Sequence, residues 1–297
     1  MKFITIFTPT YNRAYTLHKL YGSLKRQTDK DFVWLIVDDG SSDGTKEVVS
    51  RWKYENVIPI KYIFQENAGK MQAHNLGAVM AESELFLCVD SDDYLEDDAI
   101  SSIRAAWNGK SREVCGIIAQ RRFIKNGSSE SVINKFPIKG LTSLHNLYKC
   151  GFKGDTALVF RTEIIRQYPF PRIEGERFIT EAVSYDLIDL KYVYLLLEKP
   201  LIVCEYMEDG YTSNAAKTKL QNPNGWALFF NQRAKYYSPT LKLKLLHAMY
   251  YIIFSRMGKA RNVYASSSIK GIIYAMAWLL SMFKEKKYLN GLIAATL

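Results

Sequence analysis

Residues 85–95, LFLCVDSDDYL, decide how the rest of the chain is interpreted. The five apolar residues 85–89 have the length of a buried strand and run directly into Asp90, Asp92 and Asp93. Carboxylates at the end of a buried strand repel one another and are costly to desolvate. A divalent cation such as Mg²⁺ or Mn²⁺ removes that cost, because these ions take oxygen ligands. The alternative is a polar turn before a helix, whose N-terminus favours acidic residues.

Length and composition are those of a folded globular protein. The 297 residues are sufficient for one large domain with an appendage, and 48% of them are hydrophobic, which excludes a disordered chain. The four cysteines are scattered without a Cys-x-x-Cys pair, which favours a reducing compartment. The N-terminus runs directly into a strand-like segment and predicts no signal peptide. The longest apolar run near the C-terminus, residues 271–283, is shorter than the roughly 20 residues of a membrane-spanning helix.

The net charge of +10 is unevenly distributed. From residue 211 onward there are 13 lysines and arginines against a single acid, Glu285, whereas the first 210 residues are nearly neutral. Such asymmetry indicates an acidic partner for the basic segment. We therefore expect one domain over residues 1–210, followed over residues 211–297 by a basic lid loop and an amphipathic helical tail.

Strand and helix patterns alternate over the first 110 residues. Four segments rich in apolar and β-branched residues predict strands, and a segment with helical spacing follows each of them. The predicted strands are residues 3–8, 32–37, 60–65 and 85–89. Pro9 cannot donate to a sheet and is expected to end the first strand. The alternation predicts a doubly wound, mostly parallel α/β sheet with helices on both faces, which binds ligands at the carboxyl ends of its strands.

The pattern is coarser beyond residue 110. Residues 193–204 mix strand and helix signals, and residues 210–225 are predicted to form an exposed loop. Three helices are predicted near the C-terminus, over residues 226–237, 240–257 and 268–282.

Polar motifs follow each of the four predicted strands. They are TPTYNR (8–13), VDDGSSDGT (37–45), NAGK with NLG (67–70 and 75–77) and DSDD (90–93). In this order, and at successive strand ends, they resemble the N-terminal half of the family-2 glycosyltransferases, which are inverting enzymes with the GT-A fold. The resemblance implies that residues 1–110 are the nucleotide-binding half of such a domain and residues 111–210 the acceptor-binding half.

Several motif residues have chemistry that suits a nucleotide. The ring of Tyr11 can stack on a base, although a tyrosine that closes the core at the rim is an alternative. The resemblance assigns Asp39 to the uracil imide N–H, and Asp38 is expected to hold the loop. Lys70, at a helix start, suits pyrophosphate or ribose, or is a solvated lysine. The remaining motif residues expected at the nucleotide are Pro9, Arg13, Asp90 and Ser91.

Asp90 and Asp92 form the family's Asp-x-Asp motif, which implies Mn²⁺ or Mg²⁺ as cofactor. Asp92 is the first choice as metal ligand, whereas Asp90 contacts a ribose hydroxyl or the metal through water. Asp93 is a third metal ligand or a helix cap. His74, with no partner visible in the sequence, is predicted to be a surface or packing residue rather than a ligand.

Inverting displacement at the anomeric carbon needs a base that takes the acceptor's hydroxyl proton. The family uses a carboxylate after the fifth or sixth strand, often as Glu-Asp before a helix. The resemblance implies Glu181 for this role, although Thr180-Glu181 stands where the family has Glu-Asp. Asp155, Glu174 and Glu176 are alternatives, and an acid that only stabilises a helix N-terminus is the structural alternative for Glu181.

The predicted C-terminal helices combine apolar faces with flanking lysines. Such helices can lie in a membrane interface, where each cation near an anionic leaflet contributes about 1 kcal/mol. The alternative is a helical appendage packed on the sheet with its lysines in solvent. Nucleic acid suits the charge but not the aspartate-rich rim, so no nucleic-acid partner is expected.

Together these patterns predict a glycosyltransferase that moves one sugar from a nucleotide-diphosphate sugar, with UDP favoured, to a cell-surface glycan or a lipid-linked acceptor. It would act in polysaccharide biosynthesis in the cytoplasm, peripherally at the inner face of the cell membrane. A sugar-1-phosphate nucleotidyltransferase is a rival, but residues 9–13 lack the glycine-rich loop that such an enzyme has after its first strand. A non-catalytic basic binding protein that keeps the fold is the other rival, and metal-dependent turnover would distinguish it.

Overall fold

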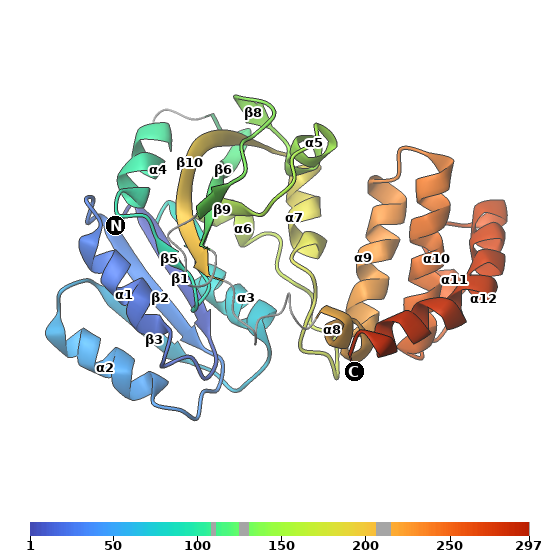
Figure 1. The fold of residues 1–297 in the computed structure, drawn as a ribbon, viewed down its shortest axis with the longest axis horizontal. Coiled ribbons are helices and arrows are strands. Elements are labelled where there is room, and N and C mark those ends of the chain that lie inside the picture. The colour runs from blue at the N-terminus through green and yellow to red at the C-terminus, as the bar shows by residue number, and fades with distance from the viewer. Residues whose placement is uncertain (108–110, 125–130, 206–214, 297) are drawn as a thin grey trace. The chain divides into compact units, whose positions relative to one another are not determined.

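The structure is a computed structural model that describes residues 1–107, 111–124, 131–205 and 215–296. The chain divides into two compact units. The first unit comprises Met1–Pro169 with Ser184–Met207, and the second comprises Phe170–Val183 with Glu208–Leu297. In Figure 1 the sheet of the first unit runs from blue to ochre, and the C-terminal helices are orange to red.

Strands and helices alternate through the first unit. They are β1 (Ile4–Thr10), α1 (Leu17–Arg26), β2 (Phe32–Asp38), α2 (Thr45–Glu55), β3 (Ile60–Phe64), α3 (Lys70–Met80), β4 (Leu85–Cys88), β5 (Tyr94–Leu95), α4 (Ala99–Trp107), β6 (Val114–Ile124), β7 (Ser131–Ile133), β8 (Leu141–Thr142), α5 (Leu144–Lys149), β9 (Thr156–Arg161), α6 (Thr162–Ile165), α7 (Ala182–Asp189) and β10 (Val193–Glu205). One sheet results, in the order β3-β2-β1-β4-β9-β6-β10-β5, with β7 paired to β6 and β8 to β10. Strands β1 to β4 are parallel, as are β6 and β10, so the predicted α/β fold is confirmed.

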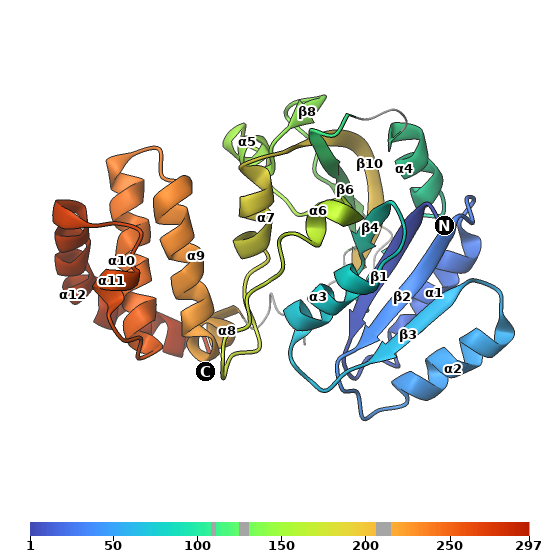
Figure 2. The same cartoon turned by 180° about the vertical axis from the view of Figure 1, so that it is seen from behind.

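Alternate residues of β1 enter two different cores. Ile4 and Ile6 pack with apolar residues of α1, α2 and α4 on one face. Phe7 points to the other face, where its ring lies 5.2 Å from that of Phe86 and edge-on to His74 of α3. The two views in Figures 1 and 2 show α1 in front of the sheet on one side and α3 on the other. Because both faces of β1 are covered, all seven of its residues are buried, and threonine is the only polar residue type among them.

Pro9 does not end β1, which corrects the prediction. The strand continues beyond it, and Pro9 pairs in register with Val37 of β2. The carbonyl of Phe7 accepts a hydrogen bond from Val89, so residues 7 and 9 direct their backbone groups toward β4. Pairing between β1 and β4 ends at Phe7. The missing N–H of Pro9 therefore points to a side where no ladder hydrogen bond is required.

Several other boundaries also differ from the predictions. Residues 193–204 belong to one long strand, β10, and β5 separates the aspartates from α4. The segment 210–225, predicted to be a loop, contains α8 (Ala215–Gln221). The Asn, Ser and Pro residues of this segment all lie outside α8, and the residues between them favour a helix. Lys217 and Lys219, which belong to the segment predicted as a basic lid loop, thus lie on a helix, and residues 206–214 are outside the described residues.

The second unit is mainly helical from residue 215 onward, whereas its other segment, Phe170–Val183, is irregular up to the start of α7. Its helices are α8, α9 (Pro223–Tyr236), α10 (Leu241–Met257), α11 (Val263–Ser266) and α12 (Gly271–Ala294). Their shared core includes Ala234, Ile252 and Phe254. The carboxylate of Glu176 accepts hydrogen bonds from the backbone N–H groups of Asn224 (2.7 Å) and Gly225 (2.8 Å). It thus caps the N-terminus of α9, where these groups have no partner within the helix.

The last helix is longer than predicted. α12 has 24 residues, whereas the apolar pattern indicated an end near residue 282. Lysine interrupts the apolar run after Phe283 but is a good helix former, so the helix continues. Among the described residues, no helix combines the length and the apolar character that crossing a bilayer requires.

His74 is a buried packing residue, as one of the two predicted options has it. It is 4% exposed, and its ring lies edge-on to Phe7 and Phe86 at 5.5 and 5.3 Å. Burial lowers the pKa of its imidazole to about 3, and the charge of Lys70 adds to this effect. The unfolded chain has a histidine pKa near 6.5. The unfolded state therefore takes up a proton first, and stability is lost as the pH falls below that value.

We expect His74→Phe to remove this part of the acid sensitivity. Through His74 alone, the wild type should lose about 2 kcal/mol of unfolding free energy between a pH of about 7.5 and a pH of about 5. Urea unfolding at both pH values measures the difference. His18→Phe, at an exposed position of α1, controls for the loss of a histidine. An unchanged pH dependence in His74→Phe would contradict the prediction.

Candidate functional site

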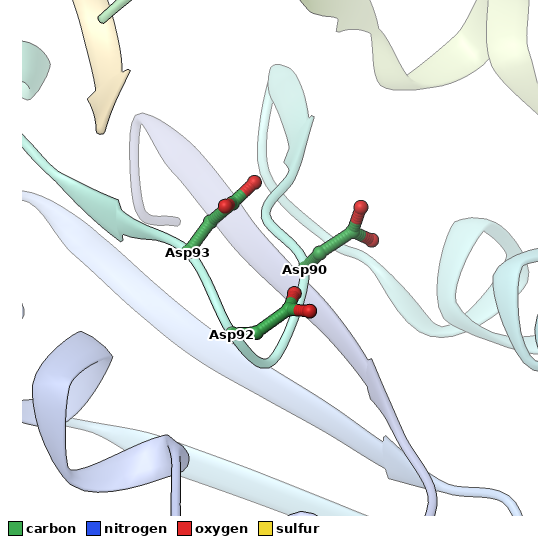
Figure 3. A group of neighbouring side chains, drawn as sticks. All are labelled: Asp90, Asp92 and Asp93. Carbon is green, nitrogen blue, oxygen red and sulfur yellow. The ribbon is translucent and has the colours of Figure 1, made fainter. Parts of the chain in front are cut away.

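Three aspartates lie on the turn that joins β4 to β5. One carboxylate oxygen from each of Asp90, Asp92 and Asp93 lies within 4.8 Å of the others. Figure 3 shows the three side chains on this one turn. The buried run of β4 ends just before them, because Asp and Ser favour turns. The turn, named here the aspartate turn (residues 90–93), thus gathers three carboxylates at the carboxyl end of a parallel strand.

The three carboxylates differ in their electrostatics. Burial raises the pKa of Asp92, and the neighbouring charge of Asp90 adds to the effect. Burial also raises the pKa of Asp93 to about 7, although Arg121 acts against it. Burial acts in the same sense on Asp90, but Lys70 and Arg121 outweigh it and hold the pKa of that carboxyl below its usual range. Asp90 is therefore ionised, whereas this environment disfavours the ionised forms of Asp92 and Asp93.

Lys70 joins two loops at this edge of the sheet. Its Nζ lies 2.8 Å from Asp90 Oδ1, and the preceding residue, Gly69, donates its backbone N–H to Asp39 Oδ2 at 2.8 Å. The first turn of α3 therefore contacts the ends of both β2 and β4, which lie on either side of β1. The alternative of a solvated lysine is wrong, because the side chain is paired and 20% exposed.

Asp39 accepts three hydrogen bonds from the segment between β3 and α3. The donors are Gln65 Nε2 (2.6 Å), Ala68 N (2.8 Å) and Gly69 N (2.8 Å). The adjacent Gly40 has a φ of +85°, and a Cβ there would come within 2.9 Å of the Asn67 nitrogen. Only glycine suits that position, so the end of β2 and this segment approach each other closely.

Asp38 holds its own loop, as predicted. Its carboxylate accepts the backbone N–H of Ser41 at 2.8 Å and the hydroxyl of Tyr62 at 2.6 Å. Both partners come from neighbouring segments of the same edge, the first from the loop after β2 and the second from β3. Asp38 is completely buried, so these two hydrogen bonds replace the solvent that the carboxylate has lost.

Asn12, which the sequence reasoning missed, fixes the loop that carries Tyr11 and Arg13. Its Oδ1 accepts the backbone N–H groups of Ser42 (2.8 Å) and Asp43 (3.3 Å), and its φ is +52°. Asparagine tolerates this left-handed conformation better than most residues. Tyr11 is 50% exposed, so the alternative in which it closes the core is wrong.

Of the other motif residues, Arg13 lies in this loop, Pro9 in β1 and Ser91 in the aspartate turn. Arg13 packs over the ring of Tyr15, with 5.7 Å from its guanidinium carbon to the ring centre. Pro9 and Ser91 are both buried. Their expected contacts with a nucleotide stay predictions.

Arg121 and Cys204, which the sequence reasoning also missed, contact the carboxylate of Asp93. Arg121 Nη1 lies 3.1 Å from Asp93 Oδ2, and Cys204 Sγ donates to the same oxygen at 3.3 Å. They come from β6 and β10, neighbours in the sheet. One signal could have found Arg121, since it is the first charged residue after the apolar run of β6. The helix-cap alternative for Asp93 is wrong, because β5 lies between it and α4.

Glu181, the expected base, belongs to the second unit, whereas the aspartate turn belongs to the first. It is exposed and lies directly before α7. Glu176, one of the alternatives, has its carboxylate engaged by the first turn of α9. The alternatives Asp155 and Glu174 are both exposed.

The oxygen atoms of the aspartate turn fit a hard divalent cation. Mg²⁺ and Mn²⁺ favour carboxylate oxygens, and a bound cation would offset the burial and the repulsion by Asp90 that together raise the pKa of Asp92. Asp93 already shares Oδ2 with Arg121 and Cys204. Asp90 also shares one oxygen, Oδ1, with Lys70, which leaves Asp92 as the first choice of donor.

Residues 5–168, more than half of the chain, match the model of a protein family described as Glycosyl transferase family 2. Among curated relatives, validoxylamine A glucosyltransferase of Streptomyces hygroscopicus subsp. jinggangensis is 38% identical over 110 residues, which are 36% of this chain and 26% of that protein. Poly(ribitol-phosphate) beta-N-acetylglucosaminyltransferase TarP of Staphylococcus aureus is 25% identical over 142 residues, 47% of this chain and 38% of that protein. The chain thus spans well under half the length of these relatives.

Solved structures share the fold. Residues 1–349 of S. aureus TarS, in complex with UDP-GlcNAc, superpose with a TM-score of 0.58 at 19% identity, over 100% of this chain and 82% of that one. Mannosyltransferase PcManGT of Pyrobaculum calidifontis, in complex with GDP-Man and Mn²⁺, gives 0.55 at 17% identity, over 99% and 86%. At these identities the likeness shows the fold alone, and it confirms the predicted GT-A type.

We expect Arg121→Met to lower the unfolding free energy by about 3 kcal/mol, because the buried carboxylate of Asp93 loses its cation. The double variant Arg121→Met with Asp93→Asn should recover most of this loss, since no unpaired charge remains. Urea unfolding measures both. Arg26→Met is the control, because it removes an ion pair with the exposed Asp97 and should cost under about 0.5 kcal/mol. A single variant as stable as the wild type would contradict the prediction.

Proposed function

The chain belongs to glycosyl transferase family 2, and from this premise we propose that it transfers a single sugar from a nucleotide-diphosphate sugar to a hydroxyl acceptor, with inversion at the anomeric carbon. The observation that carries the proposal is the meeting of Asp39, Lys70 and the aspartate turn at one edge of the sheet. A nucleotide sugar needs an acceptor for its base, positive charge for its diphosphate and oxygen ligands for a cation. This edge supplies all three.

A UDP-sugar is the donor that we propose first. Tyr11, half exposed at the end of β1, would stack on the base, and Asp39 would accept the imide N–H of uracil. A carboxylate oxygen can accept two hydrogen bonds, so Oδ2 of Asp39 has capacity beyond its bond from Gly69. Pro9, Arg13 and Ser91 would line the same nucleotide site. The complexes of TarS with UDP-GlcNAc and of PcManGT with GDP-Man support a nucleotide sugar and make GDP the nucleotide to test against UDP.

Asp90 and Asp92 would hold Mn²⁺ or Mg²⁺, whereas Asp93 forms an ion pair with Arg121. A bound divalent cation supplies positive charge that stabilises a departing diphosphate. Lys70 lies against Asp90 at the first turn of α3, and the N-terminus of a helix also favours anions. We propose that Lys70 contacts the same phosphates.

The reaction also needs a base. We propose that the carboxylate of Glu181 accepts the proton of the acceptor hydroxyl while the hydroxyl oxygen forms a bond to the anomeric carbon and the nucleotide diphosphate leaves. Glu176 is the weaker choice, because its oxygen atoms accept the N–H groups of α9. Asp155 and Glu174 are the competitors that the Glu181 experiment has to distinguish.

We propose that the acceptor is a cell-surface glycan or a lipid-linked saccharide and that the protein acts in the cytoplasm at the inner face of the membrane. The uneven charge supports this location, because the net positive charge of the chain is concentrated after residue 210. A lipid-linked acceptor would be presented at that surface.

Isothermal calorimetry tests the donor site. We expect UDP to bind in the presence of Mn²⁺, GDP, CDP and TDP to bind at least about tenfold more weakly, and Asp92→Ala to lose the Mn²⁺-dependent part of the affinity. Asp97→Ala, an exposed aspartate beyond β5, is the matched control and should bind as the wild type does. If the folded protein bound none of the four nucleotides, the transferase proposal would be wrong.

Release of UDP from the donor in the presence of acceptor tests the base. Glu181→Gln should lower kcat by about a thousandfold with unchanged UDP affinity, because only proton transfer is removed. Glu174→Gln, in the same segment, should retain wild-type kcat. Wild-type kcat in Glu181→Gln would assign the base to another carboxylate, and Asp155→Asn would be measured next.

A further inference from the structure

The first four turns of α12 present an apolar strip to solvent. The apolar strip consists of Ile272, Met276, Leu279, Leu280, Met282 and Phe283. Four of these residues recur at spacings of four, three and four, which places them on one side of a helix. All six are exposed, and Phe283 and Ile272 are 80% and 79% exposed. A contiguous exposed face of large apolar side chains indicates a binding surface rather than a core.

The opposite side of α12 is used within the second unit. Ala277 and Ser281 are buried there, and Ala277 shares a core with Ile252 and Phe254 of α10. Glu285, one turn further on, pairs with Arg256 of α10 at 2.8 Å. The helix is thus held by one side, and its apolar strip points away from the core that holds it.

Lysines continue the exposed side of α12 where the apolar strip ends. Lys284, Lys286 and Lys287 follow Phe283 in the sequence, and all three are exposed. The single acid beyond residue 210 is Glu285, whose carboxylate is neutralised by Arg256 on the packed side. The exposed side of the helix is therefore apolar and cationic, which is complementary to a surface with an apolar interior and anionic headgroups.

We propose that α12 docks the protein on an anionic phospholipid surface, with the apolar strip between the acyl chains at the headgroup boundary and the three lysines on the phosphates. This deepens the proposed function by naming the partner surface, and it rests on that function for the acceptor that the surface would present. The lysines favour lipid over a second copy of the chain, since the same segment of a copy would carry the same positive charge and no free acid.

Co-sedimentation of the full chain with lipid vesicles tests the proposal. One preparation is pure phosphatidylcholine, and in the other phosphatidylglycerol makes up a third of the lipid. We expect binding to the anionic vesicles, at least about tenfold weaker binding to the neutral ones, and weaker binding in high salt.

Two sets of variants separate the contributions. Leu279→Ser with Phe283→Ser removes the apolar anchor and should lower partition onto anionic vesicles by at least about tenfold. Lys286→Glu with Lys287→Glu should remove the preference for anionic lipid. Tyr54→Ser with Val57→Ser, an exposed pair in the first unit, is the matched control and should bind as the wild type does. Thermal melting verifies that each variant is folded.

Equal partition of the wild type and the apolar-strip variant would overturn the proposal. It would also be overturned by a dimer that depends on the apolar strip and does not bind vesicles, as measured by sedimentation velocity. UDP calorimetry on the same variants should be unchanged. A wild type that binds vesicles but not UDP would count against the proposed function and leave the docking surface standing.

Discussion

Several carboxylates are buried at the carboxyl edge of the sheet, and the arrangement of the loops there depends on this constraint. Asp38, Asp39 and Asp93 are all buried there. A buried charge without partners destabilises a protein by several kcal/mol, so each carboxylate needs donors from a neighbouring segment. Those donors come from the loop after β2, from the segment between β3 and α3, and from β6 and β10. The hydrogen bonds and the ion pair that the carboxylates form therefore fix the positions of these segments.

The same hydrogen bonds and ion pairs connect fold to chemistry. Asp39 binds the backbone just before α3, and Lys70, the first residue of that helix, binds Asp90. The ends of β2 and β4 are therefore coupled through two consecutive residues. The Glycosyl transferase family 2 match, from residue 5 to residue 168, includes Asp39, Lys70 and Asp90.

The second unit contributes a different kind of surface. Its helices pack around Ile252 and Phe254, and α12 uses only one side for this purpose. The other side carries apolar residues followed by lysines. The sequence pattern indicated amphipathic helices with lysine flanks, but which residues are covered and which are exposed depends on how α12 packs on α10. The excess of basic residues thus belongs to the second unit, whereas the polar rim belongs to the first.

The sequence by itself determined the strand and helix alternation of the first 110 residues, the aspartate turn and the motifs at successive strand ends, because apolar period and turn composition are local properties of the chain. It also indicated that Asp38 holds its loop. The prediction that Pro9 ends the first strand was wrong, because a strand can contain proline where its nitrogen faces an unpaired side, and which side of β1 is paired depends on the sheet. Only the tertiary structure decided that β9 lies antiparallel between β4 and β6, and that Arg121 and Cys204 meet Asp93 across 28 and 111 residues of chain. No local pattern records which strands are neighbours, so the partners of a buried charge become visible only when the sheet is assembled.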